Sequence, residues 1–362
     1  MLIEGGDPGR APDGTPPPAL TEVADRVDRR LDDVLAAELG RWRNLDPALG
    51  PPLESLRRLV VGGGKRLRPA FCFWAHVGAG GDPDDPRLLD TGAALEFLQA
   101  FALVHDDVMD GSATRRGVPA IHTEFAGRHA DAGWRGESRR FGEGVAILAG
   151  DLAHVYADRL MTGAPPAVIE IWHELRIEVN VGQYLDIEAT ARAAVDLATA
   201  RRISRYKSGK YTIERPLELG AALAGRADDL GPALAGYGHP LGEAFQLRDD
   251  LLGAFGDTER IGKPVGDDLR EGKPTPLLAL AHERATAAQR TALGLVGRRD
   301  LDADGVAAVQ AVLVATGARD AVESGIAELT AAAVAHLDTI ELHEPAVAAL
   351  RDLAVYVGNR QL

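Results

Sequence analysis

Two acidic clusters, each near the end of an alanine- and leucine-rich helical stretch, constrain this chain more than any other feature. The first is Asp106, Asp107 and Asp110 within DDVMD, and the second is Asp249 and Asp250 within FQLRDD. Residues four apart on a helix share a face, so Asp106 and Asp110 should point the same way, with Asp107 about 100° round. Like charges this close repel one another unless cations neutralise them. The fold must therefore bring positive charge to both helix ends.

Carboxylate pairs supply the hard oxygen ligands that magnesium prefers, and magnesium in proteins commonly keeps waters and binds substrate phosphates. A single DDxxD run is also compatible with a solvated charged face. Two runs, the first followed at once by Arg115 and Arg116, favour a metal–diphosphate site. The five aspartates of the two clusters are therefore the candidate metal ligands and catalytic residues.

Basic residues beside glycine turns support this interpretation. GGGKRLRP at 62–69 places three glycines and three cations before a strongly apolar helix. Backbone amides in such a loop form an anion site with lysine and arginine, and arginine can hold phosphate oxygens in bidentate fashion. Glycine plus lysine is also ordinary loop chemistry, and the Walker spacing GxxxxGK[ST] is absent here. Further lysines beside glycines are Lys207, Lys210, Lys263 and Lys273.

The overall charge separates two classes of partner. The chain has 362 residues and a formal net charge of −14. Proteins that bind nucleic acid usually present a basic face, so this acidity argues against nucleic acid. Cations gathered beside glycine turns in so acidic a chain are instead expected to bind small anionic molecules.

Apolar residues recur at helical spacing through most of the chain, and strand-like alternation is scarce. Alanine, leucine and arginine dominate, which favours helix. We therefore predict a nearly all-α fold, with a surface loop at 126–142. Long core helices are expected at 21–42, 88–107, 144–162, 167–190, 215–225, 233–254 and 304–337.

The chain shows no targeting or membrane signal. Residues 1–19 are rich in glycine, proline and aspartate, so we predict a disordered tail there. They also lack the apolar region of a signal peptide. No run of about 18 uninterrupted apolar residues exists, so no membrane insertion is expected. The single cysteine, Cys72, lies in an apolar run and is expected to be a core residue, in keeping with a reducing cytoplasm.

Taken together, the motifs resemble those of the trans-isoprenyl diphosphate synthases, or polyprenyl synthetases. The likeness runs from about Leu56 to the C-terminus. It comprises six motifs in the order of the family, and the wording around GWRG and YKSGKYTIERP is most similar to actinobacterial geranylgeranyl diphosphate synthases. The motifs are GGGKRLRP at 62–69, LVHDDVMDGSATRRG at 103–117, ILAGD at 147–151, GQYLDI at 182–187, FQLRDD at 245–250 and GKPVGDDLREGKPTP at 262–276.

The resemblance implies one large helical bundle over residues 20–362, built around a central substrate tunnel. It implies a prenyltransferase that condenses isopentenyl diphosphate with an allylic diphosphate, such as dimethylallyl, geranyl or farnesyl diphosphate. Two to three magnesium ions per active site would assist ionisation of the allylic partner. The expected product is geranylgeranyl diphosphate, and the expected assembly is a homodimer.

The resemblance also assigns roles to single residues. Lys207, Lys263 and Arg115 would bind the allylic diphosphate, and Lys207 is also assigned a catalytic role there. Isopentenyl diphosphate would be held by Lys65, Arg68, Arg116 and Gln99, and further substrate contacts are assigned to Ser208, Gln246 and Lys273. Gln183 and Asp186 would support metal or substrate through water, whereas His105 is expected to be a packed, hydrogen-bonded histidine.

Two positions depart from the family's pattern. Gly253 stands where the second cluster usually has a third aspartate, so metal binding there would rely on Asp249 with water or diphosphate oxygens. Gln99 stands where a histidine usually contacts isopentenyl diphosphate. Glutamine can still donate a hydrogen bond, but it carries no charge.

Product length is expected to depend on Phe101 and Ala102, just upstream of the first cluster. Phe101 lies about 7–8 Å below Asp106 along the helix. One aromatic residue at this depth with a small neighbour resembles the geranylgeranyl synthases. The alternative is that Phe101 is ordinary core packing and another residue forms the tunnel floor.

Two other enzyme classes and one non-enzyme class compete with this interpretation. A class I terpene cyclase also uses a DDxxD, but it usually pairs this motif with an NSE-type triad and has no need of GGGKRLRP. A farnesyl or longer-chain synthase of the same family would share every motif. A non-catalytic regulatory subunit would be expected to have lost its aspartates, and both clusters persist here.

Overall fold

The structure is a computed structural model that describes residues 15–193, 196–256 and 266–359. Within these ranges the chain is nearly all α-helical, so the predicted fold class is confirmed. The described strands are β1 (Thr114–Arg115) and β2 (Val118–Pro119), an antiparallel pair that follows the first acidic cluster.

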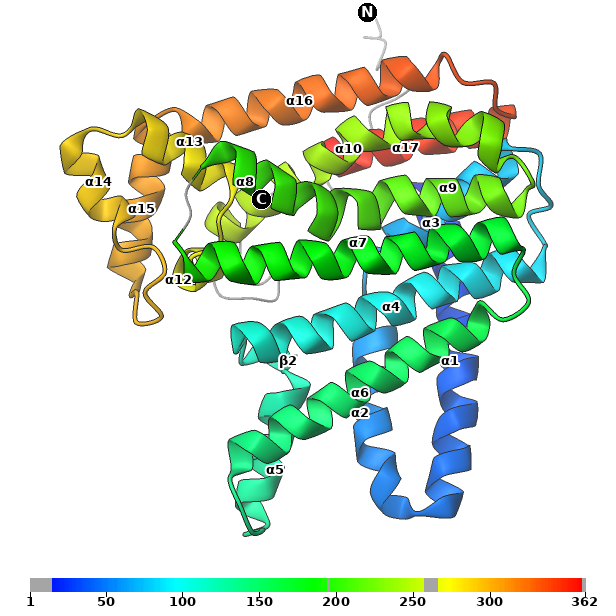
Figure 1. Ribbon diagram of the computed structural model, residues 1–362, viewed down its shortest axis with the longest axis horizontal. Coiled ribbons are helices and arrows are strands. Elements are labelled where there is room, and N and C mark those ends of the chain that lie inside the picture. Colours follow the sequence, from blue (N-terminus) through cyan, green and yellow to red (C-terminus); the bar gives the residue numbers. More distant parts are fainter. Residues whose placement is uncertain (1–14, 194–195, 257–265, 360–362) are drawn as a thin grey trace, which may run out of the picture.

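Helices follow one another with short connections (Figure 1). Prolines stand in the first turn of several of them, where their missing N–H costs nothing. The helices are α1 (Pro18–Leu45), η1 (Pro47–Leu49), α2 (Gly50–Val61), α3 (Leu67–Gly78), α4 (Pro86–Asp110), α5 (Ile121–Asp131), α6 (Ser138–Leu160), α7 (Pro166–Ala191), α8 (Leu197–Ile203), η2 (Ser204–Glu214), α9 (Arg215–Leu223), α10 (Ala227–Phe255), α12 (Asp267–Glu271), α13 (Pro276–Arg284), α14 (Ala287–Leu293), α15 (Ala303–Ala315), α16 (Ala318–Leu337) and α17 (Glu344–Asn359).

The long helices lie side by side. In Figure 1, α4 and α7 cross the middle of the molecule, α6 runs diagonally against α4, and α16 follows the upper edge. Helix η2 packs against both α7 and α10, and α12 packs against α10. The C-terminal ends of α4 and α10 therefore meet the segment around α12, which brings the two acidic clusters to one side of the bundle.

Helix η2 is a π-helix, a rare form that frequently occurs at functional sites. Glycines let it approach its neighbours closely. A Cβ on Gly182 of α7 would lie 2.4 Å from the backbone nitrogen of Lys207, and a Cβ on Gly242 of α10 would lie 2.9 Å from the Cα of Gly209. Any larger residue at 182 or 242 would push η2 outward, so these glycines fix its position between two helices.

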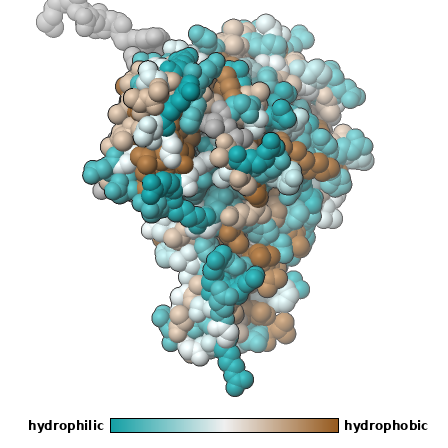
Figure 2. Space-filling view, turned by 60° about the vertical axis from the view of Figure 1, so that its left-hand side comes forward, coloured by the Kyte–Doolittle hydropathy of each residue, from teal (hydrophilic) through white to brown (hydrophobic). Residues whose placement is uncertain are grey.

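Buried leucine, valine and phenylalanine side chains form one large core that joins α1–α4 to α6, α7, α9, α10 and α17. A second core lies among α10 and α12–α16. Each fully buried large apolar side chain contributes about 1.5–3 kcal/mol, so these cores dominate stability. Apolar residues also remain exposed, and Figure 2 shows hydrophobic surface gathered along one side of the molecule.

Three predicted boundaries differ from the structure. Helix α1 begins at Pro18 and Leu20 is buried, so two residues assigned to the tail are helical, while residues 1–14 lie outside the described chain. The segment 126–142 is the end of α5, a short connection and the start of α6. The predicted helix 304–337 is two helices, since Gly317 has a φ of 69° and interrupts it.

The correction at 126–142 has a clear physical cause. The arginine-rich segment 126–142 looked like a loop, but His129 packs its ring 5.2 Å from that of Phe141 and helps to join α5 to α6.

Within the described ranges no single helix has the length and apolar character needed to cross a membrane. The pair α15 and α16, bent by 63°, meets that criterion only when the two are taken together.

Candidate active site

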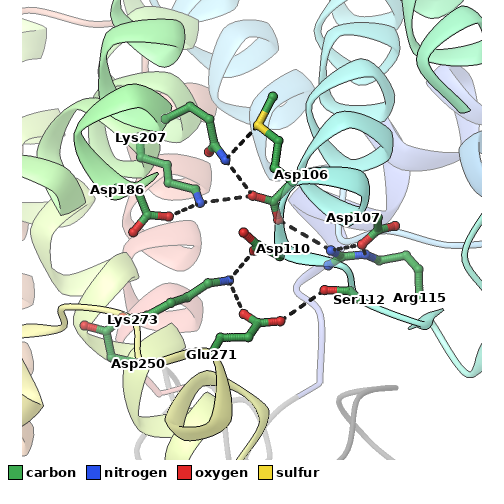
Figure 3. A network of polar contacts seen from close by, with 12 residues as sticks. Asp106, Asp107, Asp110, Ser112, Arg115, Asp186, Lys207, Asp250, Glu271 and Lys273 are labelled. Carbon is green, nitrogen blue, oxygen red and sulfur yellow. Dashed lines mark hydrogen bonds and ion pairs between the residues drawn. The ribbon is translucent and has the colours of Figure 1, made fainter. Parts of the chain in front are cut away.

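The first acidic cluster occupies the last turn of α4. The helix ends at Gly111, whose φ of 68° suits glycine. Asp106 and Asp110 face the helices α7, η2 and α12, as their four-residue spacing predicted. Asp107 points elsewhere and accepts a hydrogen bond of 2.9 Å from Nε of Arg115. Figure 3 shows this division of the cluster.

Lys207 of η2 links the first cluster to α7. Its Nζ lies 3.1 Å from Oδ1 of Asp106 and 2.5 Å from Oδ2 of Asp186. Gln183 donates a further hydrogen bond of 3.0 Å to Asp106. Burial raises the pKa of Asp106, but the positive charges of Lys207, Lys273 and Arg115 outweigh that effect and hold this pKa well below its usual range.

Asp110 has a different environment. Lys273 places its Nζ 3.0 Å from Oδ2 of Asp110 and 2.7 Å from Glu271, which in turn accepts a 3.0 Å hydrogen bond from Ser112. Burial and the negative charges of Asp106 and Glu271 nevertheless raise the pKa of Asp110. Burial is the largest cause of this rise, and the positive charge of Lys273 opposes it.

The second acidic cluster lies near the end of α10. Asp250 is only 4% exposed, and its Oδ1 accepts a 2.7 Å hydrogen bond from Gln246. Its other oxygen, Oδ2, is buried without a hydrogen-bond partner among the described residues. Burial raises the pKa of Asp250 well above its usual value, and the nearby carboxylates of Asp268 and Asp249 raise it further.

The glycine-rich loop before α3 divides its cations between two tasks. Arg66, with a φ of 50°, is buried and donates to Asp28 at 2.7 Å and to Glu96 at 2.5 Å, so it ties the loop to α1 and α4. All three cations of the loop line a cavity, but the guanidinium of Arg66 is taken up by Asp28 and Glu96. Arg68 therefore has the position of a ligand-binding residue, whereas Arg66 is structural.

Two residues of the π-helix hold Arg68. Its guanidinium lies 4.2 Å from the ring centre of Tyr211, and its Nη2 donates a 2.9 Å hydrogen bond to Thr212. Nε of Arg68 is buried without a partner among the described residues. Near it, burial lowers the pKa of Arg116, and the charges of Arg66 and Arg115 lower it further. Such crowding of positive charge stabilises a bound anion.

These residues surround a cavity of about 320 Å³ between α3, α4, α7, η2 and α10. Asp106 of the first cluster and Asp249 of the second both line it, together with the cations of the glycine-rich loop. The predicted site residues on its wall are Lys65, Arg68, Gln99, Ala102, Asp106, Arg116, Lys207, Ser208 and Asp249. Those beside it are Asp107, Asp110, Arg115, Gln246, Asp250 and Lys273. Lys263 lies outside the described residues.

Phe101 is the predicted site residue that the structure separates from the cavity. Ala102 and Leu103 line the cavity, but Phe101 faces α6, where its ring stacks 4.7 Å from His154 and lies 4.6 Å from His105. Phe101 therefore packs where α4 meets α6, and its role in product length stays a prediction. His105 is packed and hydrogen-bonded as predicted, 3.1 Å from the carbonyl of Ile147.

Sequence reasoning missed several residues that the fold brings to the site. Glu96 lines the cavity, and helical spacing could have identified it, because it stands three positions before Gln99, a predicted substrate contact, on the same side of α4. Tyr211 and Thr212 stand four positions after Lys207 and Ser208, a spacing that would have pointed to them had a helix been predicted over this segment. Glu271 carries no separate signal inside its charged motif.

The donor set fits magnesium shared with a diphosphate. No three His, Cys, Asp or Glu side chains among the described residues converge to hold a metal alone. Magnesium commonly uses one or two protein carboxylates together with water and substrate phosphates, so convergence of three is not required. The buried Oδ2 of Asp250, which has no hydrogen-bond partner among the described residues, marks a place where a cation would offset negative charge.

Known proteins share both the sequence and the fold. Residues 52–313 match the polyprenyl synthetase family. A geranylgeranyl pyrophosphate synthase from Corynebacterium glutamicum, solved with isoprenyl diphosphate and magnesium, is 38% identical with a TM-score of 0.90 over 94% of this chain and 99% of that chain. A geranylfarnesyl diphosphate synthase of Aeropyrum pernix is 32% identical over 74% of this chain and 80% of its own length. A (2E,6E)-farnesyl diphosphate synthase of Mycobacterium bovis is 31% identical over 95% and 90%.

A helical bundle in which two aspartate clusters and a basic loop share one cavity defines a transferase that acts on prenyl diphosphates. The chain belongs to the polyprenyl synthetase family and is a trans-prenyltransferase, so the predicted family, including its actinobacterial likeness, is confirmed.

Proposed function

We propose that this enzyme condenses isopentenyl diphosphate with allylic diphosphates and that its main product is geranylgeranyl diphosphate. The observation that carries the proposal is that Asp106, Asp249 and the cations Lys65, Arg68 and Arg116 line one cavity. Opposite charges on its wall suit two diphosphates, one bound through metal and one bound directly by guanidinium and ammonium groups.

The allylic diphosphate would lie at the aspartate end. Two to three magnesium ions, held by the aspartates of both clusters, would supply Lewis-acid stabilisation of the leaving diphosphate. Lys207, already between Asp106 and Asp186, is within reach to donate a hydrogen bond to the same diphosphate, and Arg115 adds charge behind it. The allylic C–O bond breaks, and the diphosphate leaves with the electron pair.

Isopentenyl diphosphate would lie at the basic loop. Lys65, Arg68 and Arg116 bind its diphosphate, and Gln99 offers an uncharged hydrogen bond on the same wall. The double bond of isopentenyl diphosphate attacks the allylic carbon and forms the new C–C bond. A proton then leaves the isopentenyl carbon for the departing diphosphate, and the product is longer by five carbons.

The product tail needs apolar space beyond the aspartates. Ala102 and Leu103 offer it on α4, and small side chains there leave the cavity open. We propose that Ala102 directs the tail and that Phe101 closes the path where α4 packs on α6. The relatives named above range from farnesyl to geranylfarnesyl synthases, so family membership alone leaves the length open.

We further propose a cytoplasmic homodimer. Exposed apolar side chains repeat at helical spacing on two long helices, among them Leu148, which is 64% exposed, and Tyr184, which is 65% exposed. Contiguous apolar surface of this kind marks protein–protein contacts. The full set is Ile147, Leu148 and Val155 on α6 with Ile177, Val181, Tyr184 and Ile187 on α7.

Incubation of the purified enzyme with magnesium, isopentenyl diphosphate and each allylic diphosphate in turn tests the function. The expected outcome is an acyclic twenty-carbon diphosphate, identified by mass spectrometry after dephosphorylation. A cyclic hydrocarbon would identify a terpene cyclase instead. A mixture ending at fifteen carbons, or passing well beyond twenty, would replace the proposed product while retaining the reaction.

A further inference from the structure

The second aspartate cluster lacks one carboxylate on its own helix. In the first cluster, Asp110 follows Asp106 by four residues and shares its face of α4. In the second cluster, the residue four positions after Asp249 is Gly253. Helix α10 therefore presents one carboxylate fewer than α4 presents.

A carboxylate from another element fills that place. A Cβ built on Gly253 would lie 1.8 Å from Oδ2 of Asp268 and 2.7 Å from its Cγ. The carboxylate of Asp268 thus rests against the backbone of α10, where a side chain at position 253 would begin. Only glycine at 253 allows this approach, because any Cβ would overlap the carboxylate.

The short helix α12 is held firmly in position. Gly266 precedes it with a φ of 75°, and Gly272 follows it with a φ of 72°. The carbonyl of Leu269 accepts a 2.8 Å hydrogen bond from the Gly297 N–H, and Leu269 itself is buried. Tertiary contacts of α12 therefore fix the position of Asp268.

Charges around Asp268 belong to the site. Its carboxylate is the largest neighbouring negative charge acting on Lys273, the same lysine that pairs with Asp110. It also acts on Asp250, whose buried Oδ2 has no hydrogen-bond partner among the described residues. Asp268 is thus close to both aspartate clusters.

We propose that Asp268 supplies the third carboxylate of the second cluster and, with Asp249 and Asp250, positions the magnesium–diphosphate complex. This inference rests on the proposed function, because it concerns the same site. It assigns Gly253 a role as well, since that glycine leaves the space in which Asp268 acts.

Magnesium binding in the presence of inorganic diphosphate, measured by calorimetry, tests the proposal apart from turnover. Asp268→Asn should weaken magnesium binding by about 10- to 100-fold, as loss of an outer carboxylate at a metal site typically does. Asp267→Asn removes the same charge one position away and should change the affinity less than twofold. Melting temperatures without magnesium verify that each variant is folded.

Moving the carboxylate from position 268 to position 253 gives a sharper test. Gly253→Asp alone should weaken binding, because its side chain collides with Asp268. The double variant Gly253→Asp with Asp268→Ala should regain most of the affinity lost by Asp268→Ala, since the Cβ of residue 268 lies 3.5 Å from that of residue 253. Failure of this rescue, or unchanged binding by Asp268→Asn, would overturn the assignment of Asp268. If the unaltered enzyme itself bound no magnesium with diphosphate, the proposed function would fail and the inference would fall with it.

Discussion

Both aspartate clusters begin with two adjacent aspartates, but the charged groups around the two clusters differ. Around the first, Lys207, Lys273 and Arg115 already neutralise much of the charge on α4. Around the second, Asp250 has an amide partner, Gln246, and its pKa is raised by burial and by other carboxylates. The protein itself thus balances one cluster, whereas the other keeps a charge that a bound cation can compensate. Similar motifs can therefore contribute differently to stability and to binding.

The largest expected effect is on turnover, which tests whether both clusters take part in the reaction. Asp106→Ala and Asp249→Ala should each lower kcat by about 10²- to 10³-fold, because each removes electrostatic stabilisation of the leaving diphosphate. Steady-state rates at saturating magnesium measure the effect, with circular dichroism as the control for folding. Near-normal turnover in either variant would remove that cluster from the chemistry.

Substrate affinity separates the basic loop from the aspartate end. Lys65→Ala and Arg68→Ala should raise the KM for isopentenyl diphosphate by about tenfold or more, since each loses a charge-assisted contact worth about 1.5–3 kcal/mol. Lys207→Ala should instead raise the KM of the allylic partner. Lys210→Ala is the matched control, because Lys210 pairs with Glu178 and does not line the cavity. Equal changes for both substrates would contradict two separate sites.

Product length tests which residues of α4 limit the space for the product tail. Ala102→Phe should shorten the main product, since this residue lines the cavity directly. Phe101→Ala should lengthen products beyond twenty carbons if the tail reaches the space between α4 and α6. Chromatography of dephosphorylated products measures both. An unchanged distribution from an active Phe101→Ala enzyme would show that Phe101 only packs against His154.

The smallest expected effect concerns metal-free stability, where the clusters should respond with opposite signs. The raised pKa of Asp250 means that its carboxylate form costs stability. That cost is absent below the unfolded pKa, near 3.9, and complete above the folded pKa. Asp250→Asn should therefore stabilise the protein at pH 7 in EDTA by about 1 kcal/mol.

Asp106→Asn should do the reverse. Its lowered pKa means that the carboxylate form adds stability, which is present above the unfolded pKa and lost as the pH falls through the folded one. Without that charge, Lys207 loses one of its two partners, which should cost about 1–3 kcal/mol. Melting temperatures of the two variants that shift in the same direction would contradict the comparison.

Adjacent residues made much of the site predictable. The sharing of a helix face by Asp106 and Asp110 follows from their spacing, and the anion-binding role that we propose for GGGKRLRP follows from its composition. Long apolar periodic segments likewise predicted the main helices. Their ends were less certain where one glycine decides, as at Gly317.

Other features depend on how distant segments meet. The packing of Asp268 on Gly253 requires the tertiary placement of α12, which no local pattern contains. The orientation of Phe101 depends on the packing of α4 against α6, which helix depth alone does not specify. Tyr211 and Thr212 reach the cavity from a π-helix, whereas the sequence analysis predicted no helix over residues 204–214.

Because η2 is a π-helix, the number of residues in it also matters for function. Removing one residue from the middle of η2 would restore ordinary helical spacing and rotate every later position by about 100°. Lys207 and Ser208 would keep their places, but Tyr211 and Thr212 would turn away from Arg68. A deletion that most surface loops tolerate would here detach the two substrate sites from each other and would also turn Ile213 out of the large core.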